Sequence, residues 1–335
     1  MSELNKIALK IVSSGKGILA ADESTGTMTK RLESVNVKSN EENRLEFRSA
    51  LFSSKSMRNC IGGVILYDET IRQNYNEKSI PELISETGAV PGIKVDTGAK
   101  KLARSNDEKI TEGLDGLRER LKNYYDLGAR FTKWRAVYLI SEKYPSKLAI
   151  NVNAHALARY ASIVQEAGMV PIVEPEVLMD GNHSAQDCFN KTSEVVKKCF
   201  DELIFQKVDL KGILLKPNMI LPGSKSNQKI NSDEIAELTI KCLINSVPSE
   251  VPGIAFLSGG QSELEATKNL NTINKHNKSK FVMTYSYGRA LQQSALKHWS
   301  KDIKDIEGTQ KIFDHRANMC SLASMGKWVE EVDKI

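Results

Sequence analysis

The chain has few of the residues that build disulfides or metal sites. Its 335 residues include only five cysteines, an odd number, and no two have the CxxC spacing of zinc or redox motifs. A disulfide framework or a zinc site is therefore not expected, and a reducing compartment such as the cytoplasm is favoured. The cysteines are Cys60, Cys188, Cys199, Cys242 and Cys320.

Histidine is equally scarce. The five histidines lie far apart in the sequence and form no pair with metal-ligand spacing. We therefore expect neither a metal ion nor another cofactor. The histidines are His155, His183, His276, His298 and His315.

Long apolar runs are missing as well. No stretch approaches the roughly 20 residues that a membrane-spanning helix needs, and the N-terminus lacks the apolar region and cleavage motif of a signal peptide. Its first residues instead place Leu4, Ile7, Ala8 and Ile11 at helical spacing, which predicts an amphipathic helix. We expect a cytoplasmic protein that does not bind membranes.

A strong excess of one charge is also lacking. The chain has 47 Lys and Arg against 42 Asp and Glu, a net charge of +5, and its lysines are spread along the whole length. This distribution argues against a nucleic-acid partner. A small positive excess suits an anionic small substrate.

What the sequence does contain is a series of eight short apolar runs with helical patterns between them. One helical pattern, residues 151–168, has apolar residues every three or four positions and ends in a glycine. Alternating strands and helices predict a parallel sheet, and eight strands close a (β/α)8 or TIM barrel. No linker divides the chain, so we expect one domain over residues 1–335. The runs cover residues 17–22, 60–67, 91–96, 129–140, 169–178, 212–217, 253–260 and 280–290.

Charged residues stand near the ends of several runs, where TIM barrels place their active sites. A single lysine at such a place usually extends to water. Buried charges on several neighbouring strands are costly unless they are paired, so their coincidence favours a site over a structural role. These residues are Asp22, Lys94, Asp96, Lys133, Arg135, Glu174, Glu176 and Lys216.

The last two runs predict a phosphate site, because the loops after strands seven and eight of such barrels often bind one. Gly259 and Gly260 allow backbone N–H groups to approach an anion. Arg289 would add a two-pronged cationic contact, and Ser258 and Ser286 would add hydroxyl donors. The first and third runs predict a second anion site, and two such sites suggest a sugar bisphosphate. The second site would be formed by Ser24, Thr27, Arg31 and Lys94.

Lys216 ends the sixth run, between the two predicted phosphate sites. Burial and the like charge of Lys133 would both lower the pKa of its amine. A neutral amine adds to a ketone and forms an iminium, which accepts the electrons of a breaking carbon–carbon bond. Asp22, Glu174 and Glu176 would supply the proton transfers.

Together these stretches resemble class I fructose-1,6-bisphosphate aldolases, and the resemblance covers nearly the whole chain. The family fold is the (β/α)8 barrel that the periodicity also predicts. The motifs that carry the resemblance are "GKGILAADESTGTMTKRL", "GIKVDTG", "FTKWRAV", "NAHALARYASI", "PIVEPEVL", "LLKPNMI", "FLSGGQSE" and "YSYGRALQQSALKHW".

The resemblance implies reversible cleavage of fructose 1,6-bisphosphate to dihydroxyacetone phosphate and glyceraldehyde 3-phosphate, in glycolysis and gluconeogenesis. It implies that Lys216 is the Schiff-base lysine. Glu174 is similar to the acid/base that dehydrates the carbinolamine and deprotonates the C4 hydroxyl, and Asp22 to the aspartate that orients lysine and hydroxyl. Lys133 resembles the lysine that stabilises charge along the path, and Glu176 a carboxylate that supports the lysine network.

The resemblance also implies the substrate contacts. Arg135 is similar to a substrate-contacting arginine. Thr27 stands where better-known members have serine, and the hydroxyl is retained. The residues that resemble one phosphate site of the family are Ser258, Gly260, Ser286, Gly288 and Arg289. Those that resemble the other are Ser24, Thr27, Arg31 and Lys94.

The sequence departs from many members of the family at its end. Those members have a flexible tail whose terminal tyrosine assists proton exchange on the enamine. Here the sequence ends in "GKWVEEVDKI", and its last tyrosine is Tyr287. We expect a fixed group, Glu176, Glu174 or the substrate phosphate, to protonate the enamine. The alternative is that protonation limits the reaction and the enamine accumulates.

Other functions stay open at this point. One alternative is an enzyme that prefers another ketose phosphate, such as fructose 1-phosphate or sedoheptulose 1,7-bisphosphate. A second alternative is a non-catalytic scaffold protein. The intact set of Lys216, Glu174 and Asp22 favours catalysis. The resemblance further implies a homotetramer.

Overall fold

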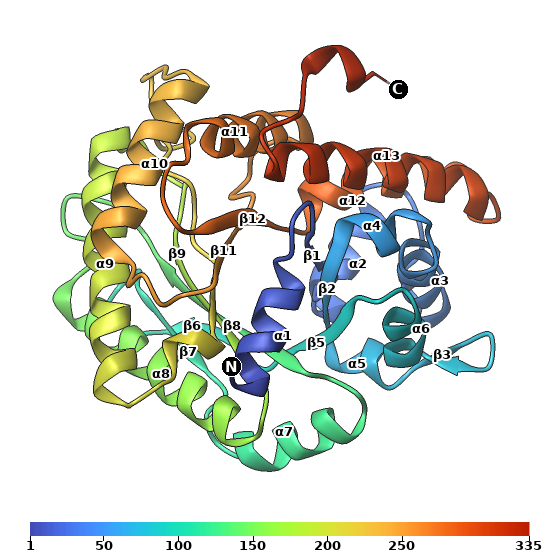
Figure 1. Cartoon of the computed structure of the whole chain (residues 1–335), viewed down its shortest axis with the longest axis horizontal. Helices are drawn as coiled ribbons and strands as arrows, with labels where there is room; N and C mark the ends of the chain where they lie inside the picture. The colour runs from blue at the N-terminus through green and yellow to red at the C-terminus, as the bar shows by residue number, and fades with distance from the viewer. Residues whose placement is uncertain (335) are drawn as a thin grey trace.

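The computed structural model describes residues 1–334 and forms a closed barrel of parallel strands surrounded by helices (Figure 1). Around the barrel the strand order is β1-β12-β11-β10-β9-β8-β5-β2. Each strand overlaps one of the eight predicted runs, so the predicted (β/α)8 barrel is confirmed. The strands are β1 (Gly17–Ala20), β2 (Ile61–Leu66), β5 (Val90–Lys94), β8 (Phe131–Tyr138), β9 (Val170–Val177), β10 (Leu214–Leu215), β11 (Gly253–Phe256) and β12 (Val282–Tyr287).

Most of the helices begin at a side chain that accepts a hydrogen bond from one of their free N–H groups. The helix predicted at 151–168 begins earlier, because Ser146 accepts a hydrogen bond from the N–H of Ala149. The α-helices are α1 (Glu3–Ile11), α2 (Thr25–Glu33), α3 (Glu41–Phe52), α4 (Ser56–Cys60), α5 (Asp68–Ile71), α6 (Ile80–Glu86), α7 (Leu117–Asp126), α8 (Lys147–Glu166), α9 (Ala185–Phe205), α10 (Ser232–Ser246), α11 (Glu263–His276), α12 (Arg289–Trp299) and α13 (Ile306–Ser324).

Short elements outside the barrel were not predicted. Two antiparallel hairpins follow barrel strands β2 and β5, and two 3-10 helices lie in the second half of the chain. They are β3 (Asn74–Tyr75) with β4 (Lys78–Ser79), β6 (Gly98–Lys101) with β7 (Lys109–Glu112), η1 (Leu210–Gly212) and η2 (Glu330–Val332).

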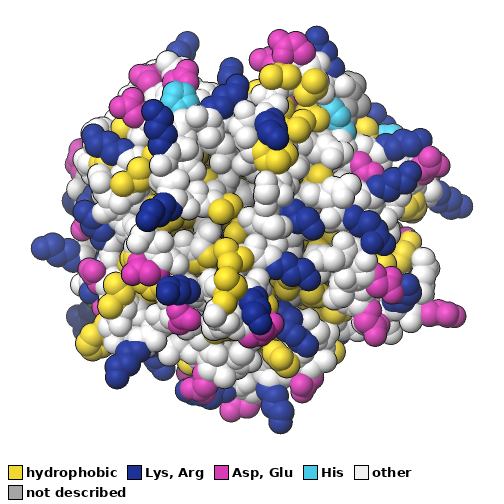
Figure 2. Space-filling view, viewed as in Figure 1, with side chains coloured by type: hydrophobic (Ala, Val, Ile, Leu, Met, Phe, Trp, Pro, Cys, Tyr) yellow, Lys and Arg dark blue, Asp and Glu magenta, His cyan; other side chains and the backbone are white. Residues whose placement is uncertain are grey.

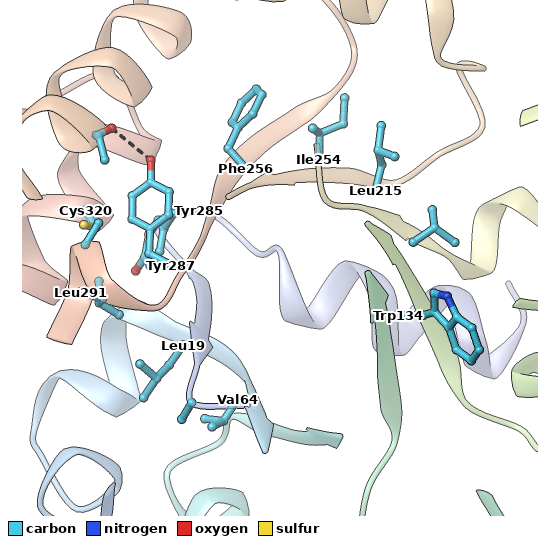
Figure 3. Packing of buried hydrophobic residues seen from close by; sticks show 14 of the residues in the cluster. Leu19, Val64, Trp134, Leu215, Ile254, Phe256, Tyr285, Tyr287, Leu291 and Cys320 are labelled. Carbon is cyan, nitrogen blue, oxygen red and sulfur yellow. Dashed lines mark hydrogen bonds between the residues drawn. The ribbon is translucent and has the colours of Figure 1, made fainter. Parts of the chain in front are cut away.

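Alternation along the strands separates two apolar layers. Outward side chains, among them Leu19, Leu215 and Phe256, pack against the surrounding helices (Figure 3). Inward side chains, among them Ile18 and Leu214, belong to a separate cluster inside the barrel. Since Leu214 points inward and Leu215 outward, the next side chain, that of Lys216, points inward again.

Helix α1 closes the amino-terminal end of the barrel (Figure 1). Its buried Ala8 and Ile11, with the following Val12, belong to the interior cluster together with Phe131 and Ile172 from the strands. Deep polar groups in the barrel are therefore reached from the carboxyl ends of the strands.

The fit of α1 predicts a large effect at Gly62 of β2. A Cβ atom at Gly62 would lie 1.9 Å from the carbonyl oxygen of Ile11. We expect Gly62→Ala to lower the free energy of unfolding by about 3 kcal/mol or more, because the clash is with backbone. Gly26→Ala is the matched control, since its added Cβ would have no heavy atom within 4 Å other than those of its chain neighbours and its own helix backbone. Denaturant unfolding measures the free energy of unfolding of both variants. A value for Gly62→Ala equal to that of the wild type would show that α1 can shift to relieve the clash.

The described residues include no helix with both the length and the apolarity to cross a bilayer. On the face drawn in Figure 2, Lys and Arg side chains are spread among Asp and Glu side chains and do not gather in one patch.

Candidate active site

A cleft of about 1230 Å³ opens at the carboxyl ends of the barrel strands. Side chains that the sequence places far apart meet there, because the ends of parallel strands share one rim. Every predicted site residue lines this cleft: Asp22, Ser24, Thr27, Arg31, Lys94, Lys133, Arg135, Glu174, Glu176, Lys216, Ser258, Gly259, Gly260, Ser286, Gly288 and Arg289.

At the bottom of the cleft Glu174 bridges two lysines. Its Oε1 lies 3.1 Å from Nζ of Lys216, and its Oε2 lies 3.3 Å from Nζ of Lys133. Nζ of Lys133 is also 2.7 Å from Oδ2 of Asp22. Lys133, Glu174 and Lys216 are all buried, so each charge depends on the others for compensation.

The bridge corrects one detail of the sequence interpretation. That interpretation treated the ammonium of Lys133 as the dominant neighbour of Lys216. In the structure the carboxylate of Glu174 lies against both amines. Glu174 and Lys216 lie in the fifth and sixth predicted runs, which are neighbours in a barrel, but the sequence does not give the register that sets the two side chains at one height.

Electrostatics keep these carboxylates ionised. Burial would raise the pKa of Glu174, but Lys133 and Lys216 outweigh it and hold that pKa below its ordinary value. Burial acts on Asp22 in the same way, and the two lysines lower its pKa to about 2. For Lys133 burial lowers the pKa, yet Asp22 and Glu174 raise it above the usual lysine value. Lys133 is therefore a fixed cation.

Glu176 lies two residues further along β9 and points into the same cleft. Its ion pair is with Nε of Arg135 on the neighbouring strand β8, not with a lysine. Burial opposes the charge of Arg135, but Glu176 raises the pKa of the guanidinium. Among the described residues Glu176 makes no ion pair with a lysine, so any support that it gives to the lysine network is indirect.

One side of the cleft carries the first predicted anion site. Gly259 and Gly260 have φ values of +56° and +84°, the left-handed region that favours glycine. The hydroxyl of Ser286 is buried and has no hydrogen-bond partner. Arg289 is exposed at the first position of α12, whose N-cap residue Gly288 provides no side-chain cap. Unpaired donors and a helix N-terminus together fit a phosphate group.

The second predicted anion site follows strand β1, which pairs with β12 in the barrel. Ser24 is the N-cap of α2, and its hydroxyl lies 3.1 Å from that of Thr27. The two cations predicted there already have partners: Arg31 pairs with Glu23, and Nζ of Lys94 lies 2.7 Å from Oδ1 of Asp96. A phosphate would therefore exchange with carboxylates at this site.

Sequence reasoning missed several residues of the cleft. Lys94 and Asp96 are two residues apart at one strand end, which was a readable signal for their ion pair. Glu23 follows Asp22 directly, but its partner Arg31 lies on the next helix. Other lining residues lie in loops or on the surrounding helices and carried no signal that the strand-end rule could detect; they include Tyr67, Arg120, Met179, Asp180, Ser224 and Gln293.

Among residues 1–334, no group of three or more His, Cys, Asp or Glu side chains has an arrangement that would hold a metal ion. The polar groups of the cleft are instead lysines, arginines, carboxylates and hydroxyls. This set can form and hydrolyse an imine, transfer protons and bind two anions.

Comparison with known proteins agrees with this chemistry. The family model for fructose-bisphosphate aldolase class-I matches residues 3–335. The chain is 46% identical over 330 residues to "Probable fructose-bisphosphate aldolase class 1" of Xylella fastidiosa, covering 98% of this chain and 99% of that protein. It is 49% identical over 326 residues to "Fructose-bisphosphate aldolase 4, cytosolic" of Arabidopsis thaliana, covering 97% and 83%.

A solved structure shows the same fold. Fructose-bisphosphate aldolase from Plasmodium falciparum, in complex with TRAP and a small-molecule inhibitor, matches with a TM-score of 0.96 and 43% sequence identity, covering 98% of this chain and 95% of that one. The chain therefore belongs to the class I fructose-bisphosphate aldolase family, lyases that cleave fructose 1,6-bisphosphate in glycolysis.

Proposed function

We propose that Lys216 is the residue that forms the Schiff base with the substrate ketone. The observation that carries the proposal is the bridge at the bottom of the cleft, in which one carboxylate, Glu174, lies within 3.3 Å of both Lys133 and Lys216. Lys133 is held by Asp22 as well, whereas Lys216 has Glu174 as its single ion-pair partner among the described residues. Lys216 is thus the amine that one proton transfer sets free.

The reaction would proceed through proton transfers at Glu174. The carboxylate takes a proton from Lys216, and the amine adds to the ketone carbon. The protonated Glu174 then donates to the carbinolamine hydroxyl, which leaves as water and gives the iminium.

Cleavage follows from the iminium. A carboxylate removes the proton of the C4 hydroxyl, and the C3–C4 bond breaks. The C4 fragment leaves as glyceraldehyde 3-phosphate, the first product, and the electron pair of the broken bond moves into the iminium to give an enamine. Asp22 and Lys133 hold their charges close to this path. We propose that Glu174 or Glu176 then protonates the enamine at C3, and water releases the second product.

Two predicted anion sites in the cleft that Lys216 also lines support a bisphosphate as the preferred substrate. Fructose 1-phosphate and sedoheptulose 1,7-bisphosphate are the alternatives, and competition between the three substrates in one assay separates them. Purified protein with fructose 1,6-bisphosphate should release triose phosphates, and excess EDTA should leave the rate unchanged. A rate that EDTA abolishes would contradict the metal-free mechanism.

Arg289 gives the test of the first anion site. Replacing it by alanine removes a charge-assisted contact worth about 1.5–3 kcal/mol, so KM for the bisphosphate should rise by about tenfold to over a hundredfold. Initial-rate kinetics measure this change. Lys297→Ala is the control, since it removes a lysine later on the same helix that does not line the cleft. An unchanged KM in Arg289→Ala would place the phosphate elsewhere.

We further propose one domain over residues 1–335, a homotetramer and a cytosolic location, the last supported by the names of the plant relatives. A second function is a protein-binding role, since the Plasmodium relative was solved with TRAP. Sedimentation analysis of the purified protein tests whether it is a tetramer.

Cleavage of fructose 1,6-bisphosphate by the purified chain tests whether it is an enzyme or a scaffold without catalytic activity.

A further inference from the structure

Arg48 is a buried arginine that has no role in the catalytic steps proposed above. It lies on α3, its side chain is 1% exposed, and it does not line the cleft. Its Nη2 donates to the carbonyl oxygen of Glu23 at 2.7 Å, and its Nη1 donates to Oγ1 of Thr70 at 2.8 Å. The guanidinium thus ties the loop after β1 to helix α5.

The loop that Arg48 holds carries predicted site residues on both sides of Glu23. Asp22, which contacts Lys133, directly precedes Glu23, and Ser24, the N-cap of α2, directly follows it. The backbone of Glu23 is therefore fixed by Arg48 from behind, on the side away from the cleft. Any movement of this carbonyl would move Asp22 and Ser24 with it.

The carboxylate of Glu23 connects Arg48 to a cation of the cleft. One oxygen pairs with Nη1 of Arg31, and the other lies 3.9 Å from Nη2 of Arg48. Nε and Nη2 of Arg31 are buried without hydrogen-bond partners. Because Arg48 shares the charge of Glu23, Arg31 is held less tightly than it would be by a carboxylate of its own.

We propose that Arg48 is a positioning residue of the aldolase reaction. It fixes the loop so that Asp22 and Ser24 face the cleft, and it balances Glu23 so that Arg31 can exchange this carboxylate for a substrate phosphate. This inference rests on the proposed function of the cleft. Arg48 itself touches neither the substrate nor the reacting atoms.

The test compares Arg48→Met and Arg48→Lys with the control Arg44→Met. Arg44 lies one turn earlier on the same helix, is also buried, and makes a two-pronged pair with Glu69. Glu69 also lies 3.8 Å from Nη1 of Arg48, but of the two arginines only Arg48 contacts Glu23. We expect Arg48→Met to raise KM for fructose 1,6-bisphosphate and to lower kcat, each about tenfold, equivalent to about 1.4 kcal/mol per constant. Arg44→Met should lower the melting temperature and leave both constants unchanged.

The lysine variant separates charge from geometry. Arg48→Lys keeps the positive charge, but one ammonium cannot reproduce the fork between the carbonyl of Glu23 and the hydroxyl of Thr70. We expect partial rescue, with KM near the wild-type value and kcat still reduced. All constants are measured at a temperature at which melting curves show each variant folded.

Two outcomes would overturn the positioning role: constants in Arg48→Met equal to those of the wild type, or changes equal to those in Arg44→Met. Should Arg48→Met fail to fold, unchanged constants in Arg48→Lys overturn it instead. The wild type is assayed first. A wild type that does not cleave the bisphosphate refutes the proposed function of the cleft, which is a different result from an active wild type with an insensitive Arg48.

Discussion

Replacing Lys216 by methionine should lower kcat/KM for fructose 1,6-bisphosphate on the order of 10⁵-fold or more, as the loss of a covalent nucleophile does in other enzymes. Lys133 cannot take its place, because Asp22 and Glu174 hold its ammonium and raise its pKa. Methionine has a similar length and Glu174 keeps its contact with Lys133, so we expect the variant to fold.

Borohydride trapping shows whether the lost residue was the nucleophile. Wild-type protein treated with dihydroxyacetone phosphate and borohydride should lose activity, and peptide mapping should find the adduct on Lys216. Lys216→Met should give no adduct. Lys211→Met, a change of an exposed lysine in η1 just before the same predicted run, should behave as the wild type. An adduct that persists in Lys216→Met would reject the assignment.

The second large effect is expected at Glu174. Glu174→Gln removes the group proposed for proton transfer, which should lower kcat by about 10²–10⁴-fold. KM should change little, because Glu174 belongs to neither of the two predicted anion sites. The carboxylate is ionised at neutral pH, so the variant also removes a buried negative charge, and melting curves must accompany the kinetics.

A matched variant on the same strand distinguishes catalysis from charge loss. Glu176→Gln also neutralises a buried carboxylate of β9, but one that pairs with Arg135 and contacts no lysine. Single-turnover trapping should slow in Glu174→Gln, since dehydration of the carbinolamine slows, and should stay near the wild-type rate in Glu176→Gln. Equal trapping rates in the two variants would remove Glu174 from this step.

Much of this site could be predicted because it depends on short-range rules. Alternation along single strands predicts the faces of Lys133, Glu174 and Lys216, and the barrel rule predicts which strand ends meet. No long-range information was needed to propose a cleft lined with charges. The family resemblance then assigned a role to each position.

The partners inside the cleft depend on tertiary structure and could not be predicted. Whether Glu174 contacts one lysine or two is decided by the register between β8, β9 and β10. The pair between Glu23 and Arg31 depends on how α2 leaves β1. The start of α8 at Lys147 was missed for another reason, since apolar periodicity does not mark a capping serine.

The seam of the barrel sets the order in which a working enzyme can form. Strand β1 pairs with β12, with Ile18 opposite Ser286, so this contact joins residues 18 and 286. Contacts of such sequence separation are slow to form, because a long loop must close first. Ser286 belongs to this contact, and Asp22 lies just beyond it on the β1 side. Strand β1 cannot pair with β12 before β12 has been synthesised, so enzymatic activity should appear only in the last stage of folding. The activity regained during refolding would therefore measure closure of the barrel.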